Sequence, residues 1–179
     1  ESDLEKLIRS GLVIRQGAAT DRIYAFKQTL VQDAAYESLL ISRRRELHRD
    51  IAETSERDFP EIFQTMPEVL AHHFSEAGQT DRAVFYWARA GNRAVERSAN
   101  HEAIAHLERG LELVTALPEG LERDRSELDL RLMRGTVLLA NKGYAAPEVT
   151  DAYTAARDLC QRVGTPEQQF AFTWGLWIN

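Results

Sequence analysis

The 179-residue sequence has little of what would reveal a function directly. Its one cysteine, Cys160, excludes an internal disulfide, and a cytoplasmic protein is expected. No run approaches the roughly 18 apolar residues needed to cross a bilayer, and no secretion signal opens the chain, so no membrane association or export is expected. The net charge of -6 at pH 7 lacks the basic excess that drives nucleic-acid binding.

Motifs that carry chemistry are also missing. The sequence contains neither a G-x4-G-K-S/T phosphate-binding loop nor a G-x-G-x-x-G turn. His72 and His73 precede Glu76, but the H-E-x-x-H order of zinc helices is absent, and adjacent residues on a helix point about 100° apart. His48 stands alone among arginines, and Cys160 is expected to be a small buried side chain. We therefore expect no catalytic residue, metal site or cofactor in this chain.

The first 58 residues combine strand and helix patterns. A short amphipathic helix is expected at residues 2–10, with Leu4, Leu7 and Ile8 facing inward. Runs rich in β-branched and aromatic residues at 12–15 and 23–26 predict a hairpin. Apolar residues at helical spacing then predict two further helices. Helix, hairpin and helices in this order are typical of a winged-helix unit whose early helices lie upstream.

A basic segment begins the second of those helices. It contains Arg43, Arg44, Arg45 and Arg49, interleaved with acidic residues. Arg49 lies four residues before Glu53, which is the spacing of a helical ion pair. Two interpretations are open, a solvated face held by salt bridges or a docking face for an acidic partner or a phosphate backbone.

A domain boundary is predicted at residues 59–66, where Pro60 and the following Pro67 interrupt the helical pattern. From residue 67 to 179, small and large residues recur as in tetratricopeptide repeats, where small residues let two helices approach closely. The best-matched unit contains Trp87, Ala90, Gly91 and Ala94 on one helix, and Ala103, Leu107 and Gly110 on the next. The sequence thus predicts a mainly α fold, with a partial winged-helix unit and its short β-hairpin at 1–58. A tetratricopeptide-like α-solenoid of about six helices follows at 67–179.

The string FKQTLVQDAAYESLL at residues 26–40, followed by RRRELHRDIAE at 43–53, resembles a segment of STAND-type signalling ATPases. The similarity is to the region after the nucleotide-binding module. It is greatest for bacterial members linked to adenylate or guanylate cyclase domains or to LuxR-type DNA-binding domains. In that family the segment is a winged helix, and tetratricopeptide-like repeats follow it.

The resemblance implies a non-catalytic regulatory fragment of a larger ATPase, with ATP or ADP bound by an upstream module of the same chain. Lys27 and Gln28 would face that module, and the solenoid would bind a protein or small-molecule signal. Family members usually carry a histidine in an F-R-H pattern that is thought to sense the nucleotide. This chain has Gln28 there, and an amide can form hydrogen bonds but cannot carry a proton charge.

Two other functions stay open at this stage. One is a winged helix that binds DNA directly, which the exposed Asp3 and Glu5 of the helix at 2–10 disfavour because carboxylates repel phosphate. The other is a scaffold whose repeats assemble a protein complex without any nucleotide switch. The aromatic residues at 170–177 would need a covering element, so we expect the chain to be a fragment of a longer protein.

Overall fold

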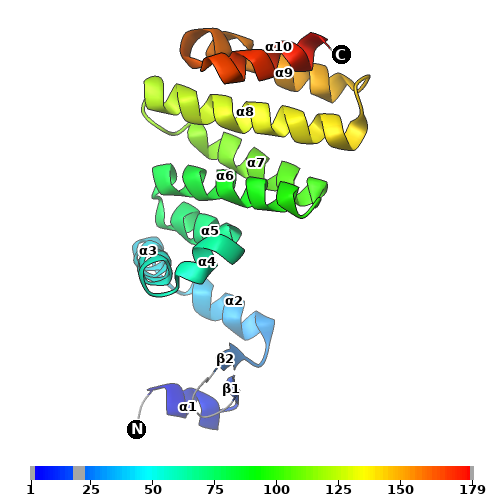
Figure 1. Cartoon of the computed structure of the whole chain (residues 1–179). Coiled ribbons are helices and arrows are strands. Elements are labelled where there is room, and N and C mark those ends of the chain that lie inside the picture. The colour runs from blue at the N-terminus through cyan, green and yellow to red at the C-terminus, as the bar shows by residue number, and fades with distance from the viewer. Residues whose placement is uncertain (1–2, 18–22, 178–179) are drawn as a thin grey trace. The chain divides into compact units, whose positions relative to one another are not determined.

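The computed structural model describes residues 3–17 and 23–177 of the protein. These residues form a two-stranded hairpin and a series of helices (Figure 1). The elements are α1 (Asp3–Arg9), β1 (Val13–Gln16), β2 (Ile23–Phe26), α2 (Thr29–Glu37), α3 (Ile41–Asp58), α4 (Pro60–Thr65), α5 (Pro67–Ala77), α6 (Thr80–Glu96), α7 (Asn100–Val114), α8 (Leu121–Lys142), α9 (Pro147–Val163) and α10 (Pro166–Trp177). The expected mainly α fold with one short hairpin is therefore confirmed. No helix within the described ranges combines the length and apolarity needed to cross a membrane.

Contacts divide the chain into two compact units, Glu1–Arg44 and Arg45–Asn179. Helix α3 begins in the first unit and ends in the second. The predicted domain limits of 1–58 and 67–179 stay predictions, but the segment expected to be a linker, 59–66, contains α4. Pro60 lies in the first turn of that helix, where its missing N–H would have had no helical partner, so this proline starts a helix.

The first unit contains α1, the hairpin and α2. The strands β1 and β2 are antiparallel, with Val13 opposite Phe26. Gly11 follows α1 with φ of 73°, a left-handed conformation that glycine adopts without strain and that ends the helix. The expected helix and hairpin are thus confirmed. The expected inward packing is wrong for Leu4 and Leu7, because both side chains are more than a third exposed, whereas Ile8 is half-buried.

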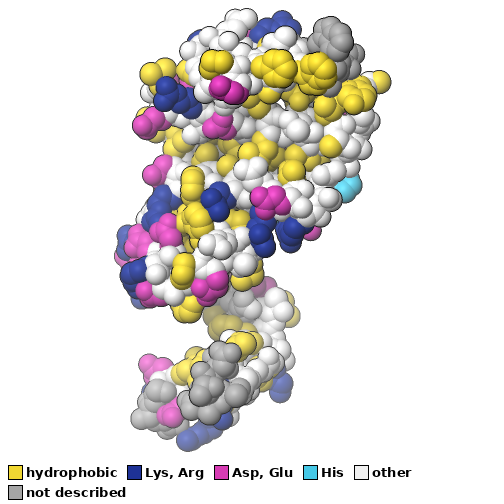
Figure 2. Space-filling view, viewed as in Figure 1, with side chains coloured by type: hydrophobic (Ala, Val, Ile, Leu, Met, Phe, Trp, Pro, Cys, Tyr) yellow, Lys and Arg dark blue, Asp and Glu magenta, His cyan; other side chains and the backbone are white. Residues whose placement is uncertain are grey.

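In the second unit the helices from α5 to α10 follow one another in space as they do in the sequence, and each packs on the next (Figure 1). Helix α6 also contacts α8, and α8 contacts α10, so these alternate helices form one layer of the row. On the face that Figure 2 shows, charged side chains gather over the α3 and α4 region, while hydrophobic side chains are frequent over α10. This row of stacked helices is the solenoid-like part of the fold.

Glycines allow the helices of the row to approach closely. A Cβ atom added at Gly91 of α6 would lie 2.6 Å from Cδ2 of Leu107 on α7, and one added at Gly110 would lie 2.9 Å from Cδ2 of Leu130 on α8. Leu107 is fully buried there. The small residues that the repeat pattern singled out therefore stand where neighbouring helices are in contact.

A polar network joins α3 to α6 inside the second unit. The carboxylate of Glu56 accepts hydrogen bonds from the guanidinium of Arg82 and from the hydroxyl of Tyr86. The guanidinium of Arg82 lies 3.9 Å from the ring centre of Phe74, which stacks on the buried ring of Tyr86. These partly buried bonds fix α3 on the row of helices, because breaking one would leave a charged or polar group without its partner.

Candidate functional site

Lys27 and Gln28, the residues predicted to face a nucleotide module, connect the hairpin to α2. The backbone N–H of Lys27 donates to the carbonyl of Leu12 at 2.9 Å, which holds this residue beside β1. Gln28 is extended, with φ of -134° and ψ of 129°, and its side chain is exposed and does not cap α2. Both side chains are therefore accessible, and their predicted role stays a prediction.

Lys27 also lines a cavity of about 580 Å³ within the first unit. Arg9 and Arg15 contribute two further cationic side chains to its wall, and Glu5 contributes one carboxylate. The surplus of positive charge makes the cavity attractive to an anion.

The four arginines of the predicted docking face belong to different surroundings. Arg44 donates from Nε to the carbonyl of Leu39 at 3.0 Å and lies 5.0 Å from the ring centre of Tyr36. Arg43 and Arg45 are exposed, and the Nε atom of Arg49 lies 3.7 Å from a carboxylate oxygen of Asp50.

The expected ion pair between Arg49 and Glu53 is wrong, because Glu53 instead accepts a hydrogen bond from the amide of Gln79 at 3.2 Å. The long side chain of this partly buried glutamate extends toward the residue before α6 and not along its own helix. The docking role of Arg43, Arg44, Arg45 and Arg49 stays a prediction.

His48 does not stand alone, contrary to the expectation from sequence. Its Nδ1 atom lies 2.8 Å from Nδ1 of His73 on α5, and the His72 ring centre is 5.7 Å away. Burial lowers the pKa of His48, while Glu76 opposes that shift. Burial and then the neighbouring histidines lower the pKa of His73 to about 4. The two facing nitrogens are therefore a neutral donor and acceptor at pH 7, a link between α3 and α5.

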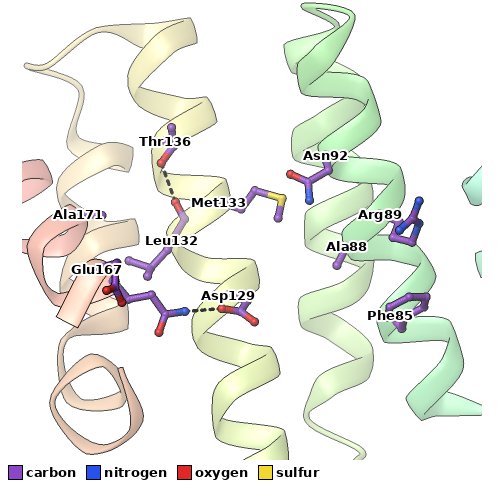
Figure 3. A pocket seen from close by; sticks show the side chains of 11 residues that line it. Phe85, Ala88, Arg89, Asn92, Asp129, Leu132, Met133, Thr136, Glu167 and Ala171 are labelled. Carbon is purple, nitrogen blue, oxygen red and sulfur yellow. Dashed lines mark hydrogen bonds between the residues drawn. The ribbon is translucent and has the colours of Figure 1, made fainter. Parts of the chain in front are cut away.

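A further candidate site is a groove lined by α6, α8 and α10, with a cavity of about 620 Å³ (Figure 3). This volume lies within the range of known ligand pockets. Apolar side chains form much of its lining: Phe85, Ala88, Leu132, Met133 and Ala171. Figure 3 shows Met133 extending from α8 toward α6, where Ala88 and Asn92 lie. An apolar floor between polar walls is the usual composition of a binding site.

A second, smaller cavity beside α4 shares two lining residues with the groove. Arg89 and Asn92 line both the main cavity and a smaller one of about 140 Å³, which Phe63 and Gln64 also line. The Arg89 guanidinium lies 3.9 Å from the ring centre of Phe63, a cation–π contact. The ring of Phe63 lies in turn 6.4 Å from that of Phe85, which is 52% exposed. The smaller cavity is therefore lined by one aromatic ring, by the cations Arg89 and Arg93, and by the carboxylate of Glu96.

The opposite wall is acidic. Asp129 on α8 accepts a hydrogen bond of 2.5 Å from the side-chain amide of Gln168 on α10, and Glu167 lies beside that glutamine. Burial raises the pKa of Asp129, and the hydrogen bond from Gln168 counteracts part of the rise. The groove therefore has a cation, Arg89, on its α6 side and carboxylates on its α8 and α10 side.

The remaining chemistry-bearing residues do not form a second site. Within residues 3–17 and 23–177, no group of three or more His, Cys, Asp or Glu side chains is arranged to hold a metal ion. Cys160 is buried on α9, as predicted, and burial raises the pKa of its thiol. A buried thiol with a raised pKa is a poor nucleophile.

Sequence reasoning placed the sensor site on the solenoid without naming residues. Arg89, Asn92 and Asp129 were missed because no local motif connects α6 with α8. The available signal was the four-residue spacing of Phe85, Arg89 and Arg93, a stripe of aromatic and cationic residues along one helix face.

Comparisons with known proteins add one relative. An uncharacterized protein of Rhizobium meliloti is 28% identical over 179 residues, covering 98% of this chain. The chain spans 17% of that relative's length. No protein-family model matches the chain, and no solved structure matches it.

Proposed function

We propose that this chain is a non-catalytic regulatory region of a larger STAND-type ATPase, linked to a nucleotide cyclase or a transcription regulator. Its row of helices binds a protein or small-molecule signal, and the protein acts in the cytoplasm. The groove of α6, α8 and α10 is the observation that carries the proposal, because its apolar floor and charged walls suit binding. The similarity to a stretch of a much longer protein supports a role as one region among several.

Helix α3 gives the signal a route through the chain. Its later residues are held on the row of helices by Glu56, which pairs with Arg82 and Tyr86, and by the contact between His48 and His73. Its first residues belong to the first unit. A ligand that binds one arrangement of the helices more tightly shifts the population toward that arrangement, and α3 carries the shift to the first unit.

The nucleotide belongs to the upstream module in this proposal. Lys27 and Gln28 stand on the exposed turn before α2. In this proposal they face that module. Because Gln28 replaces the histidine of related proteins, it contributes a neutral hydrogen bond to the nucleotide-bound state, and release of ADP is faster than with histidine.

The proposal is tested on the gene that encodes the longer protein and on that full-length protein. The proposal requires a G-x4-G-K-S/T loop after a strand upstream of Glu1, and nucleotide binding by the full-length protein. We expect Gln28→His to slow the release of a fluorescent ADP analogue. The matched control is Gln32→His, at an exposed position of α2. A parent protein without the loop, and with no measurable nucleotide binding, would leave the chain as a scaffold and refute the proposal.

A further inference from the structure

Arg89 has an unusual environment in the groove. Its Nε atom is enclosed and has no hydrogen-bond acceptor among the described residues, and no carboxylate in that part of the chain forms an ion pair with it. By contrast, Nε of Arg93 donates to the carbonyl of Thr65 at 3.0 Å. The guanidinium of Arg89 is held in place by the ring of Phe63, so it is positioned without being neutralised. Arg89 is only half-buried and lines the cavity, so its guanidinium, which no carboxylate of the described residues neutralises, can attract an external anion.

The neighbours of Arg89 indicate which chemical groups a ligand would carry beside its anionic group. Asn92 is exposed three residues later, on the same face of α6, and its amide supplies a second donor. Phe85 is 52% exposed four residues before Arg89, and Met133 extends toward this helix (Figure 3). A planar guanidinium and an amide beside an aromatic ring and a thioether match a carboxylate next to an apolar side chain.

The acidic wall adds a third requirement. Asp129 and Glu167 lie across the cavity from α6 and would repel a second anion. They attract a cationic group instead. A polyphosphate or a nucleic-acid backbone, which is anionic along its whole length, fits this arrangement poorly.

We propose that the groove binds an extended peptide segment of a partner protein, with an acidic, an apolar and a basic side chain placed across it. The acidic side chain contacts Arg89 and Asn92, the apolar one lies on Phe85 and Met133, and the basic one faces Asp129. The main cavity and the smaller one beside α4 share Arg89 and Asn92, and an extended chain is a ligand long enough to reach both. The inference rests on the proposed binding function of the helical row and names the class of its ligand.

A displayed random peptide library, selected on the whole 179-residue chain, tests the proposal. We expect the enriched peptides to share an acidic residue near an apolar and a basic one. A synthetic enriched peptide, labelled for fluorescence anisotropy, should bind Arg89→Gln about 10- to 100-fold more weakly, because a hydrogen bond to a charged group is lost. Replacing the acidic residue of the peptide by its amide should weaken binding similarly.

Two further variants keep the test independent of folding. Asn92→Asp changes an exposed residue and places a carboxylate three residues from Arg89, so it should also abolish most of the binding. The matched control is Arg109→Gln on α7, whose exposed guanidinium pairs with Glu112 at 3.0 Å, and it should leave the affinity unchanged within about twofold. Thermal unfolding of each variant establishes that it is folded.

The outcomes separate this inference from the proposed function. Enriched peptides that lack acidic residues, or that bind Arg89→Gln as tightly as the unchanged chain, overturn the Arg89 site and leave the regulatory role standing. A selection that enriches no peptide refutes the proposal that the ligand is a peptide segment. The nucleotide-binding test on the parent protein decides the regulatory role separately, since it does not involve Arg89.

Discussion

The two units differ in how much apolar surface each buries. In the first unit, Val13 is the one buried hydrophobic side chain among the described residues, while Leu30, Leu40 and Ile41 are 81%, 77% and 67% exposed. The second unit contains continuous clusters of buried side chains, in which Leu70 and Phe74 are completely enclosed. Amphipathic helices therefore bury their apolar side chains in the second unit and leave them largely exposed in the first.

This difference shows what a helical pattern does and does not specify. The spacing of apolar residues in α2 and in α5 is equally helical, and both segments form helices. The pattern specifies the face that is apolar, whereas burial depends on which element lies against it. In α5 that element is α6, which follows after a short turn. The stability of α5 is therefore supplied by its neighbours, and that of α2 is mostly local.

A pair of matched leucine substitutions gives the largest expected effect. Leu70→Ala should lower the free energy of unfolding by about 2–5 kcal/mol, because a fully enclosed side chain leaves a cavity. Leu30→Ala should change it by no more than about 0.5 kcal/mol, since that side chain is 81% exposed and both residues favour helices. Urea unfolding of the 179-residue chain measures both.

Similar losses of unfolding free energy for Leu70→Ala and Leu30→Ala would contradict the difference between the two units. A Leu30→Ala cost above about 2 kcal/mol would mean that the apolar face of α2 is buried in solution. The two units would then bury their apolar residues alike, and the contrast between them would be lost.

Gly91 provides the second test, on the close approach of helices in the second unit. Gly91→Ala should cost about 1–2 kcal/mol, since overpacking against Leu107 outweighs the higher helix propensity of alanine. Gly78→Ala is the control, because Gly78 has φ of 75° and no atom near its missing Cβ, so its cost comes from the backbone alone.

A double variant distinguishes the two causes. Leu107→Ala removes the atoms that crowd Gly91, so the costs of Gly91→Ala and Leu107→Ala should be less than additive. The costs of Gly78→Ala and Leu107→Ala should add. Additive costs for the Gly91 pair, measured by urea unfolding, would contradict a role of this glycine in helix packing.

Much of the fold could be predicted because its determinants are local. The periodicity of residues 67–179 predicted successive helices, and the small residues at Gly91 and Gly110 marked where two of them touch. Pro60 was interpreted as a break, although the same residue starts α4, because proline disrupts the interior of a helix but is favourable in its first turn. The direction of the proline effect depends on a boundary that the sequence leaves open.

The candidate site could not be predicted in the same way. Arg89 and Asp129 meet at one groove only because α6 and α8 lie side by side, and no spacing in the sequence encodes that contact. The Nδ1 atoms of His48 and His73 likewise lie 2.8 Å apart only because α3 packs on α5. Interactions within one helix follow from spacing, whereas those between helices require the fold. Spacing can mislead even for two residues of one helix: Glu53 of α3 accepts a hydrogen bond from Gln79 and does not pair with Arg49.

The smallest expected effect is a dependence of stability on pH. It concerns the second unit alone, because all five histidines belong to that unit. The pKa of His73 is lowered to about 4 in the folded chain, whereas an unfolded histidine has an ordinary value near 6.5. Between these values the unfolded state binds more protons, so the free energy of unfolding should fall as the pH is lowered through this window. Lowering the pH from 7 to 6 should remove about 0.7 kcal/mol through this group, and the loss should grow toward pH 4.

His73→Gln should make the pH dependence shallower, because glutamine can still form hydrogen bonds with His48 but does not titrate. His101→Gln, at an exposed position, is the control and should keep the original slope. Urea unfolding at several pH values between 4 and 7 measures both variants. The groups that face His73 are His48 on α3 and His72 and Glu76 on α5, and all three stay in place. Burial of this imidazole is the main cause of its lowered pKa, so an unchanged slope in His73→Gln would assign the acid sensitivity to another group.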